Sequence, residues 1–393
     1  MISVRAVVCL GMTQLVGWGV TFYLIGALGP AMAADLGWNA ATVYGGFSAA
    51  IVAMALVSPL AGRLVDQWGG HRVMPAGAAV AAAGCAGLAL SHSLIPYYAA
   101  WALLGVGMRF CLYDAAFASL ARAAGPAARR PMSQITLFGG LASTVMWPVG
   151  HALSGWLGWR GAVLGYAALA LATLPLYLAL PRKRYQMPRE DRGNVSSGLA
   201  RSAGERRLAG GLYALIAMLT NFVAAGNAAH LISMLSGLGL ASALAVSVAA
   251  LWGVGQFAAR LADVALGSRL HPLTLTLAVS ALLPLCFLLA LISGGNVYAA
   301  SAYALLYGAC NGLLTIARGT LPLALFDFRH YGALVGALLI PSFLLTAIAP
   351  VAYAYVVEQY GARAAMALSA GLALAILLAA FVLRRRFIAR ARE

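Results

Sequence analysis

Charged residues are scarce in this chain. They make up 9% of its 393 residues, where a soluble domain carries about 25%. Acidic residues are the rarest, at 10 in total, and they are scattered along the sequence. Membrane enzymes usually gather His, Asp and Glu side chains at one membrane face, and this sequence contains no such cluster. The composition therefore argues against an enzyme.

Cysteine is also rare, and its positions show no metal-ligand spacing. The five cysteines stand singly in apolar sequence, at Cys9, Cys85, Cys111, Cys286 and Cys310. We interpret them as small buried hydrophobic residues. The sequence also lacks a glycine-rich phosphate loop and a nucleophile triad, so we expect no metal and no cofactor. A cleavable signal peptide is not evident, because the first apolar run, at about 6–34, is too long.

Apolar residues, in contrast, make up 63% of the chain, too many for one aqueous core. Lipid must therefore be the solvent, and a helix of about 20 apolar residues crosses a bilayer. We predict an all-α membrane protein with twelve transmembrane helices. The predicted spans lie near residues 6–33, 41–61, 73–91, 95–120, 133–156, 160–180, 210–236, 240–262, 272–293, 297–320, 332–356 and 362–383.

The net charge of +16 could indicate a nucleic-acid partner. The basic residues, however, form short clusters between apolar runs, which is the pattern of membrane topology. The longest basic loop runs from Arg182 to Arg207 and separates the sixth span from the seventh. By the positive-inside rule we expect both termini in the cytoplasm and no nucleic-acid partner.

The chain reads as two related halves. We predict an N-terminal six-helix bundle at 1–181, a basic cytoplasmic linker at 182–208 and a C-terminal six-helix bundle at 209–393. Two short stretches in the first half resemble stretches in the second, each about half a chain later. Ala100–Leu104 resembles Ala302–Leu306, and Gly158-Trp159-Arg160 parallels Gly361-Ala362-Arg363.

A short charged hinge joins the second and third spans. Gly62 permits close approach of two helices, and Gly69 permits a backbone turn that residues with a Cβ resist. Asp66 lies near the carbonyl end of the preceding helix, where the macrodipole disfavours an anion, so we expect Arg63 and Arg72 as its partners. The same pattern returns about half a chain later. The repeated hinge residues are Arg260, Asp263 and Arg269.

Twelve spans in two halves, joined by this hinge, resemble the major facilitator superfamily of secondary transporters. The residues that match the family's hinge pattern are Gly62, Leu64, Asp66 and Gly69. Gln67 departs from it, because the family has arginine there. The resemblance implies alternating access, in which two bundles rock about a central site near the midplane. The hinge would then be a gate that Asp66 and Arg72 lock, and a turn that sets topology alone is the alternative.

Two further stretches bear on the branch of the family. Residues 147–151, Trp-Pro-Val-Gly-His, match the family's antiporter motif only in part, which disfavours a drug/proton antiporter. Gln134–Gly140 and Asn311–Pro322 look like a bacterial branch near the monocarboxylate porters. We therefore expect a multi-pass protein of the bacterial inner membrane, and a monomer.

Polar residues inside the spans are the candidates for chemistry. Arg109 lies in the fourth span, and an arginine at a helix centre costs about 2.5–3.5 kcal/mol to insert. It is either a bidentate anchor for an anionic substrate or half of a structural ion pair. Asp114 would lie about 140° around a continuous helix from Arg109, so direct pairing is awkward. Asp114 could instead carry a proton or pair with Arg318 of the tenth span.

Weaker candidates are the other polar residues of the spans, which often serve as interhelical hydrogen-bonding groups instead. The residues that we assign to the substrate pathway, besides Arg109, Asp114 and Arg318, are Gln14, Tyr23, Gln134, Asn227, His230, Tyr307 and Asn311.

Taken together, the sequence predicts a secondary transporter for a small organic solute, an anion such as a carboxylate, coupled to protons as a symporter or to exchange. A multidrug or toxic-compound exporter of the same fold is the alternative. The partners expected are the substrate, protons and the lipid bilayer.

Overall fold

The computed structural model describes residues 2–186, 198–266 and 270–389, and this part of the chain is helical without any strand. In the first half the helices are α1 (Val4–Val20), α2 (Leu24–Leu36), α3 (Ala40–Trp68), α4 (Gly70–Ala89), α5 (Leu94–Cys111), α6 (Tyr113–Ala124), η1 (Gly125–Ala128), α7 (Arg129–Gly140), α8 (Ala142–Ala172) and η2 (Leu174–Ala179). In the second half they are α9 (Ala203–Gly237), α10 (Ser242–Ala265), α11 (Pro272–Ile292), α12 (Val297–Leu325), η4 (Phe328–His330), α13 (Tyr331–Leu338) and α14 (Ile340–Phe387).

Short polar side chains set several helix starts. The Asn39 side chain accepts the Thr42 N–H at 2.7 Å where α3 begins. Ser202 and Glu205 form a reciprocal capping box at the start of α9. These side chains satisfy N–H groups that the first helical turn leaves without an intrahelical acceptor.

Nine helical runs in the described part of the chain are long and apolar enough to cross a bilayer. Two of them are too long for one crossing, since Leu94–Ala179 has 86 residues and Phe328–Phe387 has 60. The first holds the fourth, fifth and sixth predicted spans, and the second holds the eleventh and twelfth. The prediction of an all-α membrane protein with twelve transmembrane helices is confirmed.

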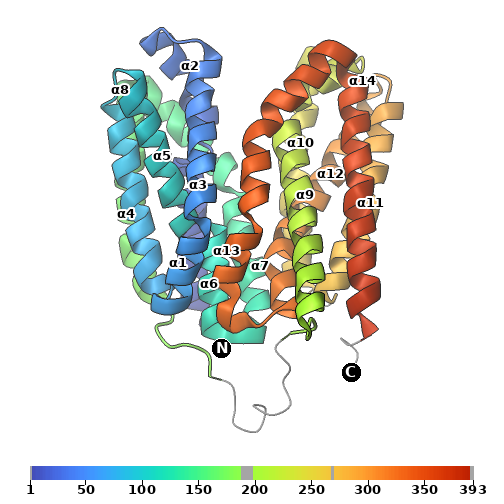
Figure 1. Ribbon diagram of the computed structural model, residues 1–393. Helices are drawn as coiled ribbons and strands as arrows, with labels where there is room; N and C mark the ends of the chain where they lie inside the picture. Colours follow the sequence, from blue (N-terminus) through green and yellow to red (C-terminus); the bar gives the residue numbers. More distant parts are fainter. Residues whose placement is uncertain (1, 187–197, 267–269, 390–393) are drawn as a thin grey trace. The chain divides into compact units, whose positions relative to one another are not determined.

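Two glycines turn the chain back between consecutive spans. Gly158 interrupts α8 with φ 68° and ψ 170°, and Gly361 interrupts α14 with φ 82° and ψ 171°. Residues with a Cβ rarely adopt this backbone conformation. Figure 1 shows α14 running in one direction and then returning beside itself. The two glycines head the stretches that the sequence aligned, so the two halves turn in the same way at matching positions.

Several spans are interrupted in a way that the apolar pattern did not predict. The first span breaks between α1 and α2, and the fourth breaks at Leu112, whose φ of −83° and ψ of −168° are not helical. The fifth and eleventh break at Leu141 and Leu339, which share nearly the same conformation (φ −88°, ψ −4° and φ −88°, ψ −7°). Thr21 and Leu112 place non-helical backbone inside the apolar runs, whereas Leu141 and Leu339 stay in the right-handed helical region.

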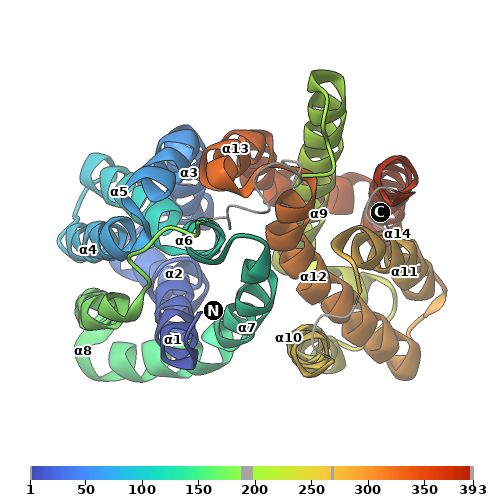
Figure 2. The same cartoon turned by 90° about the horizontal axis from the view of Figure 1, so that it is seen from below.

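The contacts between residues divide the chain into two compact units. The first unit is Met1–Asn194 with Phe328–Ile340, and the second is Val195–Asp327 with Pro341–Glu393. In the first unit α4, α5 and α3 pack in a row, and α13 lies against α3, as Figures 1 and 2 show. In the second, α12 packs against α10 and α11. The predicted bundle and linker boundaries stay a prediction, and part of the linker, 187–197, lies outside the described residues.

Candidate functional site

The hinge between α3 and α4 is held by the start of α13, within the first unit. Asp66 is 8% exposed, and its carboxylate accepts the N–H groups of Gly332 at 3.0 Å and of Ala333 at 2.8 Å. The first N–H groups of a helix lack intrahelical acceptors and carry the positive end of the macrodipole, so they suit an anion. The hydrogen bonds of Asp66 thus come from backbone N–H groups, where the sequence led us to expect the cations of Arg63 and Arg72.

Glycines bring α3 and α13 into backbone contact. A Cβ on Gly62 would collide with the carbonyl of Gly332, and a Cβ on Gly336 would lie 2.5 Å from the Ser58 carbonyl oxygen. The Ser58 hydroxyl donates a hydrogen bond of 2.6 Å to the Gly336 carbonyl. The close approach predicted for Gly62 is confirmed, and small residues with a bridging hydroxyl are a common way to join membrane helices.

Arg122 completes the hinge, although the sequence pattern did not identify it as a hinge residue. Its Nε donates to the Asp66 carbonyl at 3.1 Å, at the carbonyl end of α3, where a cation is favoured. Its own carbonyl accepts the Tyr185 N–H at 2.8 Å. Gly69 turns the chain between α3 and α4 with φ 81°. No spacing rule would have identified Arg122, because its contact with α3 depends on tertiary packing.

The second copy of the hinge is described only in part. Arg260 is 4% exposed and, like Asp263, lies near the end of α10. Arg269 lies outside the described residues. Where the first copy has Gly69, the second has Leu266, with φ −74°. The gating role assigned to the second copy therefore stays a prediction.

Arg109 and Asp114 form an ion pair across the break at Leu112. Arg109 Nη1 lies 3.8 Å from Asp114 Oδ2, and the side chains are 2% and 8% exposed. Arg109 Nε also donates to the Ser58 hydroxyl at 2.8 Å. The expectation that direct pairing is awkward assumed one continuous helix, and it is wrong because α5 ends at Cys111 and α6 begins anew. The pair therefore fits a structural role for Arg109 within the first unit.

Two other predicted residues of the first unit lie beside helix breaks. Gln14 is completely buried, and its Nε2 donates to the Cys111 carbonyl at 2.9 Å, where α5 ends. Tyr23 precedes the first residue of α2, and its ring lies 6.3 Å from those of Trp18 and Trp147. Gln134 is half-buried on α7. Their assignment to the substrate pathway stays a prediction.

Three predicted residues of the second unit are packed within it. The Asn227 amide oxygen accepts the Tyr303 hydroxyl at 3.0 Å, which joins α9 to α12. His230 Nε2 lies 2.8 Å from the Pro350 carbonyl of α14. Tyr307 is 2% exposed, and its ring stacks on that of Tyr303 at 5.8 Å. These contacts fit interhelical packing, and the pathway role of the three residues is untested.

The second unit contains a small cavity between α9, α11 and α12. Arg318 and Asn311, both predicted pathway residues, line it. The Tyr213 hydroxyl donates to the Arg318 carbonyl at 3.0 Å. The full lining comprises Tyr213, Ile216, Ala217, Thr220, Asn221, Thr276, Asn311, Leu314, Thr315, Ala317, Arg318 and Leu321. Among these described residues one is cationic and none is acidic, so the cavity favours an anion.

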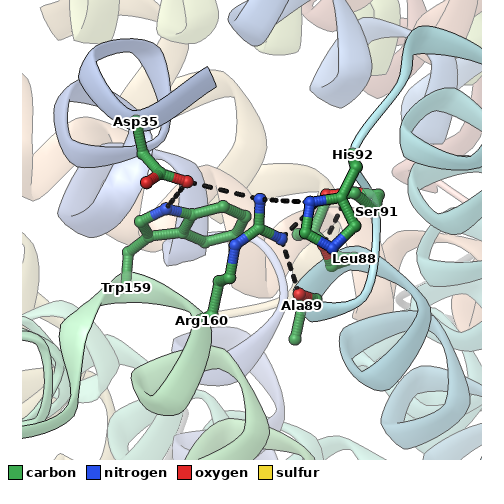
Figure 3. Close-up of polar contacts among 7 residues, drawn as sticks. All are labelled: Asp35, Leu88, Ala89, Ser91, His92, Trp159 and Arg160. Carbon is green, nitrogen blue, oxygen red and sulfur yellow. Dashed lines mark hydrogen bonds and ion pairs between the residues drawn. The ribbon is translucent and has the colours of Figure 1, made fainter.

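A polar cluster in the first unit joins α2, α8 and the connection from α4 to α5 (Figure 3). Arg160 donates to the carbonyls of Ala89 at 2.7 Å and Ser91 at 2.8 Å. Its Nη2 lies 3.3 Å from Asp35 Oδ2 and 3.3 Å from His92 Nδ1. The hydrogen bonds of Arg160 satisfy carbonyls at the end of α4 and just after it. We interpret the cluster as a structural connection.

The comparisons with known proteins agree with this architecture. A family model described as Major Facilitator Superfamily matches residues 10–263, which is more than half of the chain. No curated protein matches. Among solved structures, the crystal structure of the human organic anion transporter MFSD10 (TETRAN) is similar with a TM-score of 0.72 and 18% identity. The match covers 96% of this chain and 99% of that one, and at this identity it shows the fold alone. The chain therefore belongs to the Major Facilitator Superfamily, a family of membrane transporters rather than enzymes.

Proposed function

We propose that this protein carries a small organic anion, such as a carboxylate, across the bacterial inner membrane by alternating access. The observation that carries the proposal is the cavity of the second unit, whose one charged lining residue among those described is Arg318. A guanidinium binds a carboxylate with two parallel hydrogen bonds, which gives orientation as well as energy. An organic cation would instead meet like charge there, which disfavours the exporter alternative.

Neutral polar groups around Arg318 could orient the rest of such a substrate. The Thr220 hydroxyl is buried and has no hydrogen-bond partner among the described residues. Asn221 donates to the Ser342 hydroxyl at 2.8 Å and is thereby held at the cavity wall. A few fixed polar groups in a mostly apolar cavity are typical of sites for small molecules. The structurally similar human protein MFSD10 is an organic anion transporter, which points in the same direction.

Substitution of Arg318 tests this proposal. We expect Arg318→Gln to weaken binding of a carboxylate by about tenfold or more, because a charge-assisted hydrogen bond contributes about 1.5–3 kcal/mol. Arg318→Lys should restore part of the loss, since it keeps the charge without the planar fork. The measurement is calorimetric binding of a panel of monocarboxylates to the purified protein.

Arg363→Gln is the matched control, because Arg363 is an exposed arginine of the same unit outside the cavity. It should bind the panel as the parent does. Should Arg318→Gln bind every carboxylate as tightly as the parent, or should the parent bind lipophilic cations and no carboxylate, the proposed substrate class is wrong.

Coupling of transport is part of the same proposal. Asp114 is the acidic residue nearest the middle of a described span, and it pairs with Arg109. Because Asp114 is engaged in this ion pair, we favour exchange of one anion for another over a proton carried by Asp114. Proton symport through a residue other than Asp114 would also agree with the resemblance of this sequence to the monocarboxylate porters.

The distribution of basic residues also predicts a membrane topology that can be tested. We expect both termini and the loop at 182–207 on the cytoplasmic side, because positively charged loops are retained there. Single cysteines introduced near Asn39, Gly295 and Glu358 should react with a membrane-impermeant thiol reagent added outside intact cells. Labelling of either terminus from outside would contradict the arrangement of twelve spans with cytoplasmic ends.

A further inference from the structure

Two hydrogen bonds fix the register between α9 and α12, the helices that supply most of the cavity lining in the second unit. The Tyr213 hydroxyl of α9 donates to the Arg318 carbonyl of α12 at 3.0 Å. The Tyr303 hydroxyl of α12 donates to the Asn227 amide oxygen of α9, also at 3.0 Å. The order of these residues is opposite in the two helices, so α9 and α12 are antiparallel.

Thr220 and Asn311 lie at the same level along the cavity, about two helical turns from Arg318. Thr220 is midway between the two α9 residues of these hydrogen bonds, and Asn311 is about midway between the two α12 residues. Two turns rise about 10 Å along a helix axis. Thr220, Asn311 and Arg318 all line the cavity. The cavity therefore has a cationic end at Arg318 and a neutral polar end at Thr220 and Asn311.

The direction of the side chains brings the two ends of the cavity closer together. Helical side chains lean toward the N-terminus of their own helix. Because the helices are antiparallel, Arg318 leans toward the level of Thr220, and Thr220 leans toward the level of Arg318. The side chains of Ile216, Ala217 and Leu314 supply apolar lining between these levels. A short chain of methylene groups would pack against this apolar wall while its two ends reach Arg318 and Thr220.

The neutral end of the cavity contains a polar atom that needs a partner. The hydroxyl oxygen of Thr220 is buried and has no hydrogen-bond partner among the described residues. A ligand that pairs with it removes the cost of an unsatisfied buried group, and a hydroxyl can both donate and accept. Among the described lining residues there is no acidic residue and no second cation. An ammonium group or a second carboxylate at this end would therefore be buried without a counter-charge, which is costly.

We propose that the cavity binds a monocarboxylate with an uncharged hydroxyl group a few carbons away, the carboxylate on Arg318 and the hydroxyl on Thr220. The inference rests on the proposed function and narrows its substrate class from carboxylates in general to carboxylates with a distal hydroxyl. Thr220 is thereby the residue that determines specificity. A hydroxyl on the carbon next to the carboxylate would lie at the cationic end, away from Thr220.

Three acids of similar size test the inference: 4-hydroxybutanoate, pentanoate and 2-hydroxybutanoate. Pentanoate has a methyl group in place of the terminal hydroxyl, and 2-hydroxybutanoate is the isomer with the hydroxyl beside the carboxylate. We expect the purified full-length protein to bind 4-hydroxybutanoate about fivefold or more tightly than either of the others, measured by calorimetry. This comparison needs no variant.

Thr220→Val removes the hydroxyl and keeps the size and branching of the side chain. It should weaken binding of 4-hydroxybutanoate to about the level of pentanoate and leave the affinity for pentanoate within about twofold. Thr220→Ser keeps a hydroxyl at the same position, so it should retain the preference for 4-hydroxybutanoate. If Thr220→Val does not fold, Thr220→Ala removes the same hydroxyl and carries the same expectation.

Thr346→Val is the matched control, because Thr346 is a half-buried threonine of the same unit that does not line the cavity. Its hydroxyl donates to the Ser342 carbonyl within α14 at 2.7 Å. The preference of this variant among the three acids should equal that of the parent.

Equal affinities of the parent for the three acids, or an unchanged preference in Thr220→Val, would overturn the distal-hydroxyl assignment and leave the proposed function standing. Binding of none of the three acids would also overturn the assignment. The proposed function would still stand if other carboxylates bind and Arg318→Gln weakens their binding. It would be wrong as well if lipophilic cations bind and no carboxylate does.

Discussion

We expect Arg109→Ala to lower the stability of the folded protein by about 3–5 kcal/mol, because it leaves the buried carboxylate of Asp114 without its counter-charge. The side chain is 2% exposed, so water cannot replace the guanidinium without opening the contact between α5 and α3. Thermal unfolding of the detergent-solubilised protein measures the loss. Arg109→Lys keeps the charge but loses the fork that reaches both Asp114 and Ser58, so its midpoint should lie between those of the parent and the alanine variant.

A double variant distinguishes an ion pair from a substrate anchor. Adding Asp114→Ala to Arg109→Ala removes the uncompensated carboxylate, so part of the lost stability should return. If Arg109 instead anchors the substrate, Arg109→Ala should weaken substrate binding while the stability of the protein stays nearly unchanged. Arg363→Ala is a suitable control, because Arg363 is an exposed arginine and its substitution should change the stability by about 0.5 kcal/mol or less. Normal stability and normal binding in Arg109→Ala would refute both roles.

The architecture could be predicted because it depends on signals that are local in the sequence. Runs of about 20 apolar residues define spans whatever their neighbours are. The turns at Gly158 and Gly361 could be aligned because a positive φ selects glycine, and the structure gives both the same conformation. Gly69 of the hinge was identified for the same reason, and Gly62 because a close approach of two helices requires a residue without a Cβ.

The side-chain partners could not be predicted, because they depend on breaks and contacts that leave little trace in the sequence. Leu112 carries no glycine or proline signal, yet its extended conformation is what brings Asp114 to Arg109. The acceptor role of Asp66 toward α13 joins residues that are far apart in the chain. The charge of Asp66 suggested the nearby arginines as its partners. Its actual partners are N–H groups at the start of α13, which is far away in the sequence, and these groups carry the positive end of that helix's macrodipole.

The contact between α3 and α13 explains how a hinge in the first half could affect both halves. α13 belongs to the first unit by its contacts, and its chain continues through Leu339 into α14 of the second unit. Any movement that separates α13 from α3 must break the two hydrogen bonds to Asp66. It must also break the Ser58 hydrogen bond to Gly336. The hinge is therefore suited to hold one conformational state, which agrees with the gating hypothesis and remains to be tested.

We expect Asp66→Asn to slow transport about tenfold or more while the protein still folds and inserts. The amide can accept one of the two N–H groups and presents its own NH₂ to the other, so one charge-assisted hydrogen bond and the attraction to the helix macrodipole are lost. A loss of about 1.5–3 kcal/mol shifts a two-state equilibrium by about ten- to a hundredfold, and a cycle with one state depleted is slow. Uptake into proteoliposomes measures the rate, and thermal unfolding checks the fold.

Gly62→Ala tests the same contact without changing charge, because its Cβ would collide with the Gly332 carbonyl and force α13 away from α3. It should slow transport to a similar extent. Gly155→Ala is the matched control, since nothing lies within 4 Å of a Cβ at that helical position. Asp263→Asn should have a smaller effect than Asp66→Asn, because the second hinge has Leu266 in place of the turning glycine. If Asp66→Asn and Gly62→Ala both transport at the parent rate, the α3–α13 contact does not gate transport, and the hinge serves only as a turn between two spans.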